Sequence, residues 1–297
     1  MSTTEISAKL VMQLRASTGL PMMKCKEALE AAGGDFEKAV DWLRKKGLET
    51  AAKKADRAMK EGRVAVRTAP NGSRGVMVQV DCETEPVSGG PDFKALVEGV
   101  LESAWAKDAA SATLEAVLGS RLPSGETVDT TVKHLVARIG ENMQVRSVAS
   151  FAGEGRVATY LHFNHRVGVM TEVRGPAAAL ASPDVKAFQD DLGKHVAFAK
   201  PVAVSREEVA KDLVDKEMEI YRAQAAQDPK MAGKPPQVVE NILRGKLDKF
   251  FAERCLLEQA WVMDDKQTVK SVLEAVSKKV GSPLTIGRFA LFQVGVA

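Results

Sequence analysis

The sequence has few cysteines, few aromatic residues and no long apolar run. Its 3 cysteines, Cys25, Cys82 and Cys255, lie far apart and lack the CxxC spacing of a metal site, which predicts reduced thiols. No apolar run approaches the roughly 18 residues of a membrane span. The first residues, MSTTEISAKL, lack an apolar signal core. We therefore expect a soluble, cytoplasmic protein without membrane contact.

The charge is not concentrated in one sign. The 42 lysine and arginine residues are interleaved with 39 acidic residues, which leaves a net charge of +3. Because phosphate binding requires a concentrated positive surface, this balance argues against direct binding to nucleic acid. At 297 residues the chain is long enough for roughly two domains. An aromatic content of 5% and abundant alanine, lysine, glutamate and valine are typical of a largely helical protein with small sheets.

Motifs for cofactor binding and covalent catalysis are also missing. GEGRVA at Gly153 leads into a predicted strand, whereas a dinucleotide site needs a helix there, and no GxxxxGK[ST] motif occurs. His162 and His165 lack a third metal ligand at a suitable spacing, even if Glu141 or Cys82 is considered. Cys82 is better explained as packed at a strand end than as a nucleophile. We expect no cofactor, no metal and no enzymatic activity.

The N-terminal part has the pattern of three short amphipathic helices. Apolar spacing predicts helices over residues 4–17 and 22–32, and a third helix that begins after Asp35 and stops at Gly47. Three such helices resemble the ubiquitin-associated fold. By themselves they could form a protein-interaction module.

An internal repeat defines the centre of the chain. GRVAVRTAPNGSRGVMVQV, from Gly62 to Val80, and GRVATYLHFNHRVGVMTEV, from Gly155 to Val173, share GRVA, nine residues and GVM. Each copy predicts a β-hairpin, and each is followed by a helix that opens on PDFKAL at Pro91 or PDVKAF at Pro183. A period of about 93 residues implies two similar α+β subdomains.

A charged helical region follows the second copy. Two helical segments, 205–225 and 237–260, are separated by DPKMAGKPPQ, whose prolines and glycine force a turn. This pattern predicts an antiparallel helical hairpin, which could mediate a homodimer, pack on a partner or only stabilise the fold. The predicted α+β fold therefore comprises a three-helix N-terminal module (1–48), a helical linker (49–61), a first core subdomain (62–151), and a second core subdomain (152–297) with the hairpin inserted at about 205–260.

One strand ends in an acidic segment that is suited to contact a partner. Val76, Val78 and Val80 alternate with more polar residues, and Cys82 to Pro86 then supply two carboxylates, a hydroxyl and a proline that cannot continue the ladder. The alternative is that Glu83 and Glu85 are ordinary solvated charges.

Several phrases along the chain resemble bacterial translation elongation factor Ts. They are LRASTGLPMMKCKEAL and GGDFEKAVDWLRKKG near the N-terminus, then AAKKADR, IGEN, YLH with RVGV, KHVA with AKP, and WVMDDKQTV. The resemblance covers nearly the full length. It implies a guanine-nucleotide exchange factor that binds elongation factor Tu, a GTPase, in its GDP-bound and nucleotide-free forms and promotes GDP release during translation elongation.

The resemblance also implies which residues contact the GTPase. Adjacent Met22 and Met23 are otherwise open to two interpretations, one core and one exposed methionine, or a soft contact pad. The expected partner-binding residues are Arg15, Met22, Met23, Thr84, Glu85, Pro86, Val87, Ile139, Gly140, His162, Val262 and Met263.

The chain departs from the family at the acidic segment. The family pattern is threonine, aspartate, phenylalanine, valine, with the phenyl ring as a wedge, whereas this chain has Thr84, Glu85, Pro86 and Val87. We expect Pro86 to insert as a smaller, rigid wedge. The competing hypothesis, based on residues 1–47 alone, is a ubiquitin-associated-like protein-binding adaptor without exchange activity.

Overall fold

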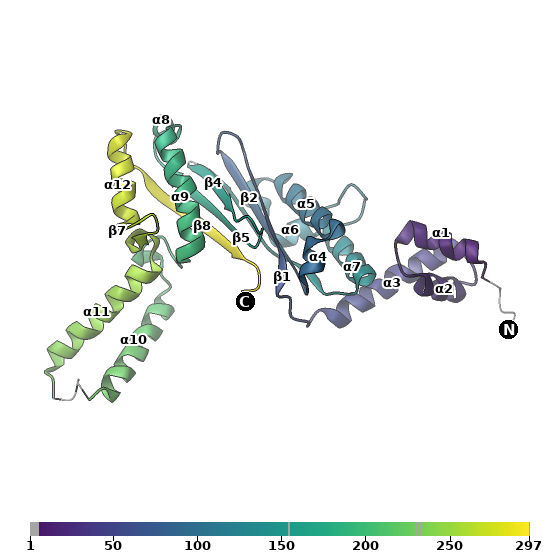
Figure 1. Ribbon diagram of the computed structural model, residues 1–297, viewed down its shortest axis with the longest axis horizontal. Coiled ribbons are helices and arrows are strands. Elements are labelled where there is room, and N and C mark those ends of the chain that lie inside the picture. The colour runs from purple at the N-terminus through teal and green to yellow at the C-terminus, as the bar shows by residue number, and fades with distance from the viewer. Residues whose placement is uncertain (1–5, 154, 230, 232, 297) are drawn as a thin grey trace.

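Two three-stranded antiparallel sheets form the centre of the molecule. The computed structural model describes residues 6–153, 155–229, 231 and 233–296. The sheets pack against each other, and helices cover their outer sides, so the fold class is α+β as predicted (Figure 1). Within the described ranges, no helix is long and apolar enough to cross a membrane.

The N-terminal part contains three helices around a small apolar core. They are α1 (Ala8–Thr18), α2 (Met22–Ala31) and α3 (Phe36–Lys54). Ser7 and Asp35 are their N-caps where the chain enters α1 and α3, because each side chain accepts a hydrogen bond from the first turn. Leu14, Cys25 and Leu29 are fully buried between the helices.

The predicted end of the third helix at Gly47 is wrong. Helix α3 continues to Lys54, so most of the expected linker is the C-terminal part of this helix. Gly47 is buried where α3 crosses α7 (Val128–Ile139), and a Cβ at this position would lie 3.3 Å from the Cβ of Ala137. The glycine therefore permits close approach of two helices and does not terminate one.

Both predicted hairpins are confirmed, and each gains a third strand from a distant part of the sequence. Strand β3 pairs with β2 along its length, and β8 pairs with β5. The first sheet consists of β1 (Glu61–Thr68), β2 (Arg74–Cys82) and β3 (Met143–Ala152); the second consists of β4 (Arg156–Leu161), β5 (Val167–Arg174) and β8 (Thr285–Gln293).

Each sheet has its own helical cover, visible on opposite sides in Figure 1. The valines of β2 that alternate in the sequence pack against α5 (Pro91–Trp105) and α7. The second sheet packs against α9 (Pro183–Ala199) and α12 (Val269–Lys279). Shorter elements complete the two halves: α4 (Glu85–Gly89), α6 (Leu114–Leu118), α8 (Ala177–Leu180), β6 (Ala260–Trp261) and β7 (Asp264–Thr268).

The inner faces of the two sheets form a third apolar layer. Met77 from β2 and Met170 from β5 are fully buried there, together with Val64 and Val157 from the two GRVA phrases. A side-chain contact also links the sheets, since the hydroxyls of Thr68 and Thr159, one from each hairpin, lie 2.8 Å apart. The repeated phrases of the sequence are therefore the residues that join the two halves.

Two long helices extend away from the second half. Helices α10 (Lys211–Gln227) and α11 (Pro236–Arg254) lie side by side as a helical hairpin (Figure 1). Near its base, Arg206 forms ion pairs with Asp248 (2.7 Å) and Glu258 (2.5 Å).

Candidate partner-binding surface

The acidic segment after β2 forms the beginning of a short helix. Thr84 is the N-cap residue of α4, and Pro86 occupies its first turn, where a missing amide donor costs nothing. Thr84, Glu85 and Pro86 are exposed, and Val87 is half-buried against the core. The structure therefore presents Pro86 on a short helix and not in an open turn.

A carboxylate from another segment holds this helix in place. The Thr84 hydroxyl donates to Glu141 Oε1 at 2.7 Å, and the Thr84 amide donates to Glu141 Oε2 at 3.1 Å. The backbone amide of Asn142 in turn donates to Glu83 Oε1 at 2.6 Å. These reciprocal bonds clamp the segment before α4 to the segment after α7. Because Ile139 and Gly140 directly precede Glu141, the structure brings two predicted contact sites together.

The end of α3 is bonded to the same place. Gly140 ends α7 in a left-handed conformation (φ 90°), and its carbonyl accepts a hydrogen bond from Lys54 Nζ. The side-chain amide of Asn142 donates to the carbonyls of Ala55 (3.1 Å) and Arg57 (3.0 Å). The end of α3 is therefore anchored beside the α4 surface.

The thiol next to this surface is not set up for nucleophilic chemistry. Cys82 is fully buried, and its Sγ donates to the carbonyl of Thr84 at 3.4 Å. Burial, together with the nearby carboxylate of Glu141, raises the pKa of Cys82 to about 12, so the thiol is neutral at physiological pH. Cys82 thus packs at the strand end as expected. Among the described residues, no group of three histidine, cysteine or acidic side chains could hold a metal ion.

The N-terminal module exposes methionines. Met22 is 43% exposed and Met23 is 72% exposed, so the interpretation that one of them fills the core is wrong. Cys25 and Leu29 take the core positions on that helix. Met12, which was not predicted, is 56% exposed, and it lies three residues before exposed Arg15 on α1. That helical spacing is the sequence signal that could have identified it.

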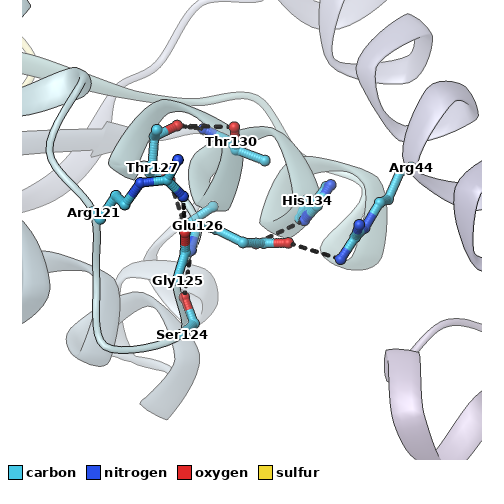
Figure 2. Close-up of polar contacts among 9 residues, drawn as sticks. Arg44, Arg121, Ser124, Gly125, Glu126, Thr127, Thr130 and His134 are labelled. Atoms are coloured by element: carbon cyan, nitrogen blue, oxygen red, sulfur yellow. Dashed lines mark hydrogen bonds and ion pairs between the residues drawn. The ribbon is translucent and has the colours of Figure 1, made fainter.

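A polar junction connects this module to α7. In Figure 2, dashed lines join the Glu126 carboxylate to Arg44 of α3 and to His134 of α7. Glu126 Oε1 lies 3.6 Å from Arg44 Nη2, and Oε2 lies 3.0 Å from His134 Nδ1. Thr127, the N-cap of α7, accepts a hydrogen bond from the amide of Thr130 at 3.1 Å. The junction lines a cavity of about 490 Å³ between the module and the core.

The β4–β5 turn carries His162 close to the start of β1. The amide of Val64 donates to the carbonyl of His165 in this turn at 2.7 Å. Strand β1 begins opposite the end of β2, where Glu61 pairs with Cys82. His162 therefore lies at the same end of the sheets as α4.

His162 is accompanied by an exposed aromatic ring that was not predicted. Its Nδ1 lies 2.7 Å from the hydroxyl of Tyr160, which orients the imidazole. The His162 ring is 4.5 Å from the ring of Phe163, and Phe163 is 86% exposed. A phenylalanine within a hairpin turn of an aromatic-poor sequence is the signal that could have marked it.

Val262 and Met263 form the turn between β6 and β7. Their side chains are 39% and 47% exposed. Helix α9 lies between this turn and His162, because Gly193 of α9 packs on Tyr160 and His195 of α9 binds the amide of Val262 at 3.3 Å. The structure thus connects the predicted sites of the core through α9 and β1.

Comparison with known proteins agrees with the earlier resemblance. A family model described as elongation factor TS matches residues 83–296. The elongation factor Ts of Symbiobacterium thermophilum is 42% identical over 294 residues, covering 98% of this chain and 92% of the relative. Those of Clostridium botulinum strain Eklund 17B and Trichlorobacter lovleyi are 39% and 38% identical, each covering 98% of this chain and 93% of the relative. The chain belongs to the elongation factor Ts family.

Proposed function

We infer that this chain is a guanine-nucleotide exchange factor that binds elongation factor Tu and promotes GDP release during translation elongation in the cytoplasm. The observation that carries this conclusion is the similarity to elongation factor Ts along 98% of the chain. The adaptor hypothesis rested on the N-terminal helices alone, and it does not account for the match over residues 83–296.

Exchange of this kind requires binding energy and no covalent step. A factor that weakens nucleotide binding to the GTPase is itself bound less tightly by the nucleotide-loaded form, because the coupling free energy is reciprocal. Both ligands can then leave, and the factor recycles. The phosphate and magnesium end of a GTPase pocket depends on closely placed amides and a metal ion, so a small displacement there weakens GDP binding most.

We assign the contacts with the GTPase to three regions of the chain. The three regions are the methionines of the N-terminal module, the α4 surface with the end of α7, and the turns at either side of α9. Each region has exposed side chains on a backbone that is fixed by hydrogen bonds or packing. The proposed contact residues are Arg15, Met22, Met23, Thr84, Glu85, Pro86, Val87, Ile139, Gly140, His162, Val262 and Met263, to which Met12 and Phe163 are added.

Pro86 is proposed as the wedge. The bonds between Thr84 and Glu141 hold the start of α4, so an exposed ring at position 86 has a defined direction. A pyrrolidine ring buries less area than a phenyl ring but loses little conformational freedom on binding. The partner surface is therefore expected to be adapted to a smaller residue.

The domain plan and the assembly state are proposals as well. We propose a ubiquitin-associated-like module at 1–48, core subdomains at 62–151 and 152–297, and a hairpin insertion at about 205–260. Separate apolar clusters in the N-terminal helices and in each half of the core support this division. Leu213 and Ile220 on α10 and Val238 on α11 are 37 to 40% exposed, which supports a homodimer through the hairpin. Sedimentation equilibrium would test it.

The exchange function is tested by release of fluorescent GDP from the elongation factor Tu of the same organism, with and without this chain. We expect acceleration that saturates with the concentration of GDP-bound partner. A rate of release that is unchanged by the added chain would contradict the proposed function.

A further inference from the structure

A buried histidine binds the backbone of the turn that carries Val262 and Met263. His195 of α9 is 0% exposed, and its Nδ1 lies 3.3 Å from the amide nitrogen of Val262. The side chains of Val262 and Met263 point outward, with 39% and 47% exposure. An inaccessible group therefore bonds directly to an exposed turn of the proposed contact surface.

The hydrogen bonds assign the tautomer of this histidine. The amide of Val262 can only donate, so Nδ1 must be unprotonated and accept, and Nε2 then carries the proton. Nε2 lies 3.0 Å from Gln259 Oε1, which accepts a hydrogen bond from the Nε2–H group. The amide group of Gln259 donates to the carbonyls of Glu253 at 2.8 Å and Ala199 at 3.3 Å. The chain of bonds thus connects the turn to the ends of α9 and α11.

Packing alone does not explain the choice of histidine at this position. The rings of His195 and Phe188 both stack on Trp261, with centroid distances of 5.1 and 5.9 Å. An apolar ring at position 195 would also stack on Trp261, as the ring of Phe188 does. It would leave the amide of Val262 and the oxygen of Gln259 without these partners, and unsatisfied buried polar groups are costly.

We propose that His195 is a positioning residue for partner binding, which holds the Val262–Met263 turn in its binding conformation through Nδ1 without touching the partner. The proposal rests on the inferred exchange function, because that function makes the turn a contact. If His195 only filled the core, two substitutions that remove the ring should change amide exchange at Val262 and the KM to the same extent.

Two substitutions separate these roles. In His195→Asn, the side-chain oxygen is attached to Cγ, as Nδ1 is, and can accept from Val262. In His195→Gln, the longer side chain reaches towards Gln259 and leaves the Val262 amide without its acceptor. Both variants lose the stacked ring, so they share the cost in packing.

Two measurements are made on the full chain with these variants. For His195→Gln we expect hydrogen exchange at the Val262 amide to be about tenfold faster by NMR, and the KM for GDP-bound elongation factor Tu to rise about fivefold with kcat unchanged. For His195→Asn both quantities should stay within about threefold of the unaltered chain. Equal behaviour of the two variants would overturn the proposal.

Further variants separate this proposal from the exchange function. Phe188→Leu removes the other ring on Trp261 and should destabilise the same core without faster exchange at Val262. Met263→Ala should raise KM if the turn is a contact, and an unchanged KM would overturn the role of His195 in binding. If the unaltered chain fails to accelerate GDP release from elongation factor Tu, the exchange function itself is wrong. The amide measurement still decides whether His195 holds the turn.

Discussion

Gly75 and Met170, from equivalent phrases of the two repeats, are packed against each other. A Cβ at Gly75 would lie 2.8 Å from Met170 Sδ and 2.6 Å from Val157 Cγ1. The reverse contact also exists, because a Cβ at Gly168 would lie 2.9 Å from Met77 Sδ. The glycine and the methionine of each GVM phrase therefore accommodate their counterparts in the other copy. The GVM phrases of the repeat therefore form part of the interface between the two halves.

Gly75→Ala and Gly168→Ala should each destabilise the fold. The added methyl group meets buried side chains at both positions, and overpacking of this kind costs about 1–3 kcal/mol. Urea unfolding would measure the loss. Gly245→Ala on exposed α11 is a matched control: a Cβ there meets nothing within 4 Å, so it should stabilise by about 0.5–1 kcal/mol. Equal unfolding midpoints for all three variants would contradict the interlocked interface.

The repeat and the local elements were predictable from sequence, because turns, helix starts and alternation are local signals. The hairpins and the helices from Pro91 and Pro183 are confirmed. The predicted helix end at Gly47 was wrong because glycine often follows the end of a helix, whereas this glycine is selected by its contact with Ala137 on another helix. Local periodicity likewise does not predict that β3 pairs with β2 and β8 with β5, because these pairings join segments that are distant in the sequence.

The candidate site was predictable in part. Family motifs named most of the proposed contact residues but not Met12 or Phe163, and the groups that hold the site together are distant in sequence. Glu141 binds Thr84 across 57 positions, and His195 binds Val262 across 67 positions. Such pairs depend on the packing of whole elements, which one sequence does not specify at the level of side-chain contacts.

Pro86→Gly should lower kcat/KM for GDP release by about tenfold while leaving the fold intact. Proline at the first turn of α4 restricts the backbone, and glycine would remove both the ring and that restriction. Stopped-flow release of fluorescent GDP is the measurement. Pro86→Phe tests the adapted interface: its kcat/KM should not exceed that of the unaltered chain, and acceleration of many fold would show that the partner still fits a phenyl wedge.

Gly47→Leu should disturb the N-terminal module more than Arg44→Ala does. A larger side chain at Gly47 pushes α3 away from Ala137, at about 1–3 kcal/mol, whereas the Arg44–Glu126 pair is partly exposed and contributes below about 1 kcal/mol. Spin labels on Lys9 and Ser120 would report the distance between module and core. A larger displacement in Arg44→Ala than in Gly47→Leu would show that the ion pair, and not helix packing, holds the module.

Acid should destabilise the chain through His195. Burial lowers the pKa of His195 below its ordinary value of 6.5, although the bond to Gln259 opposes the shift. The contacts described for the ring, namely Gln259, the Val262 amide and Trp261, are uncharged. Because the unfolded chain takes up the proton first, this contribution is complete above about pH 6.5 and is lost as pH falls to the folded pKa. Urea unfolding from pH 7.5 to 5.5 should show a steeper loss for the unaltered chain than for His195→Asn.

Phe163→Ala should weaken partner binding without a loss of stability. The ring is 86% exposed, so its removal changes the free energy of unfolding by less than about 0.5 kcal/mol. If Phe163 is buried by the partner beside His162, the loss of its apolar area should raise the dissociation constant for nucleotide-free elongation factor Tu by about tenfold. Isothermal titration calorimetry would measure this. Phe198→Ala, at a ring that is 78% exposed on α9 and outside the proposed contacts, is the matched control. Equal dissociation constants for Phe163→Ala and the unaltered chain would remove this ring from the contact surface.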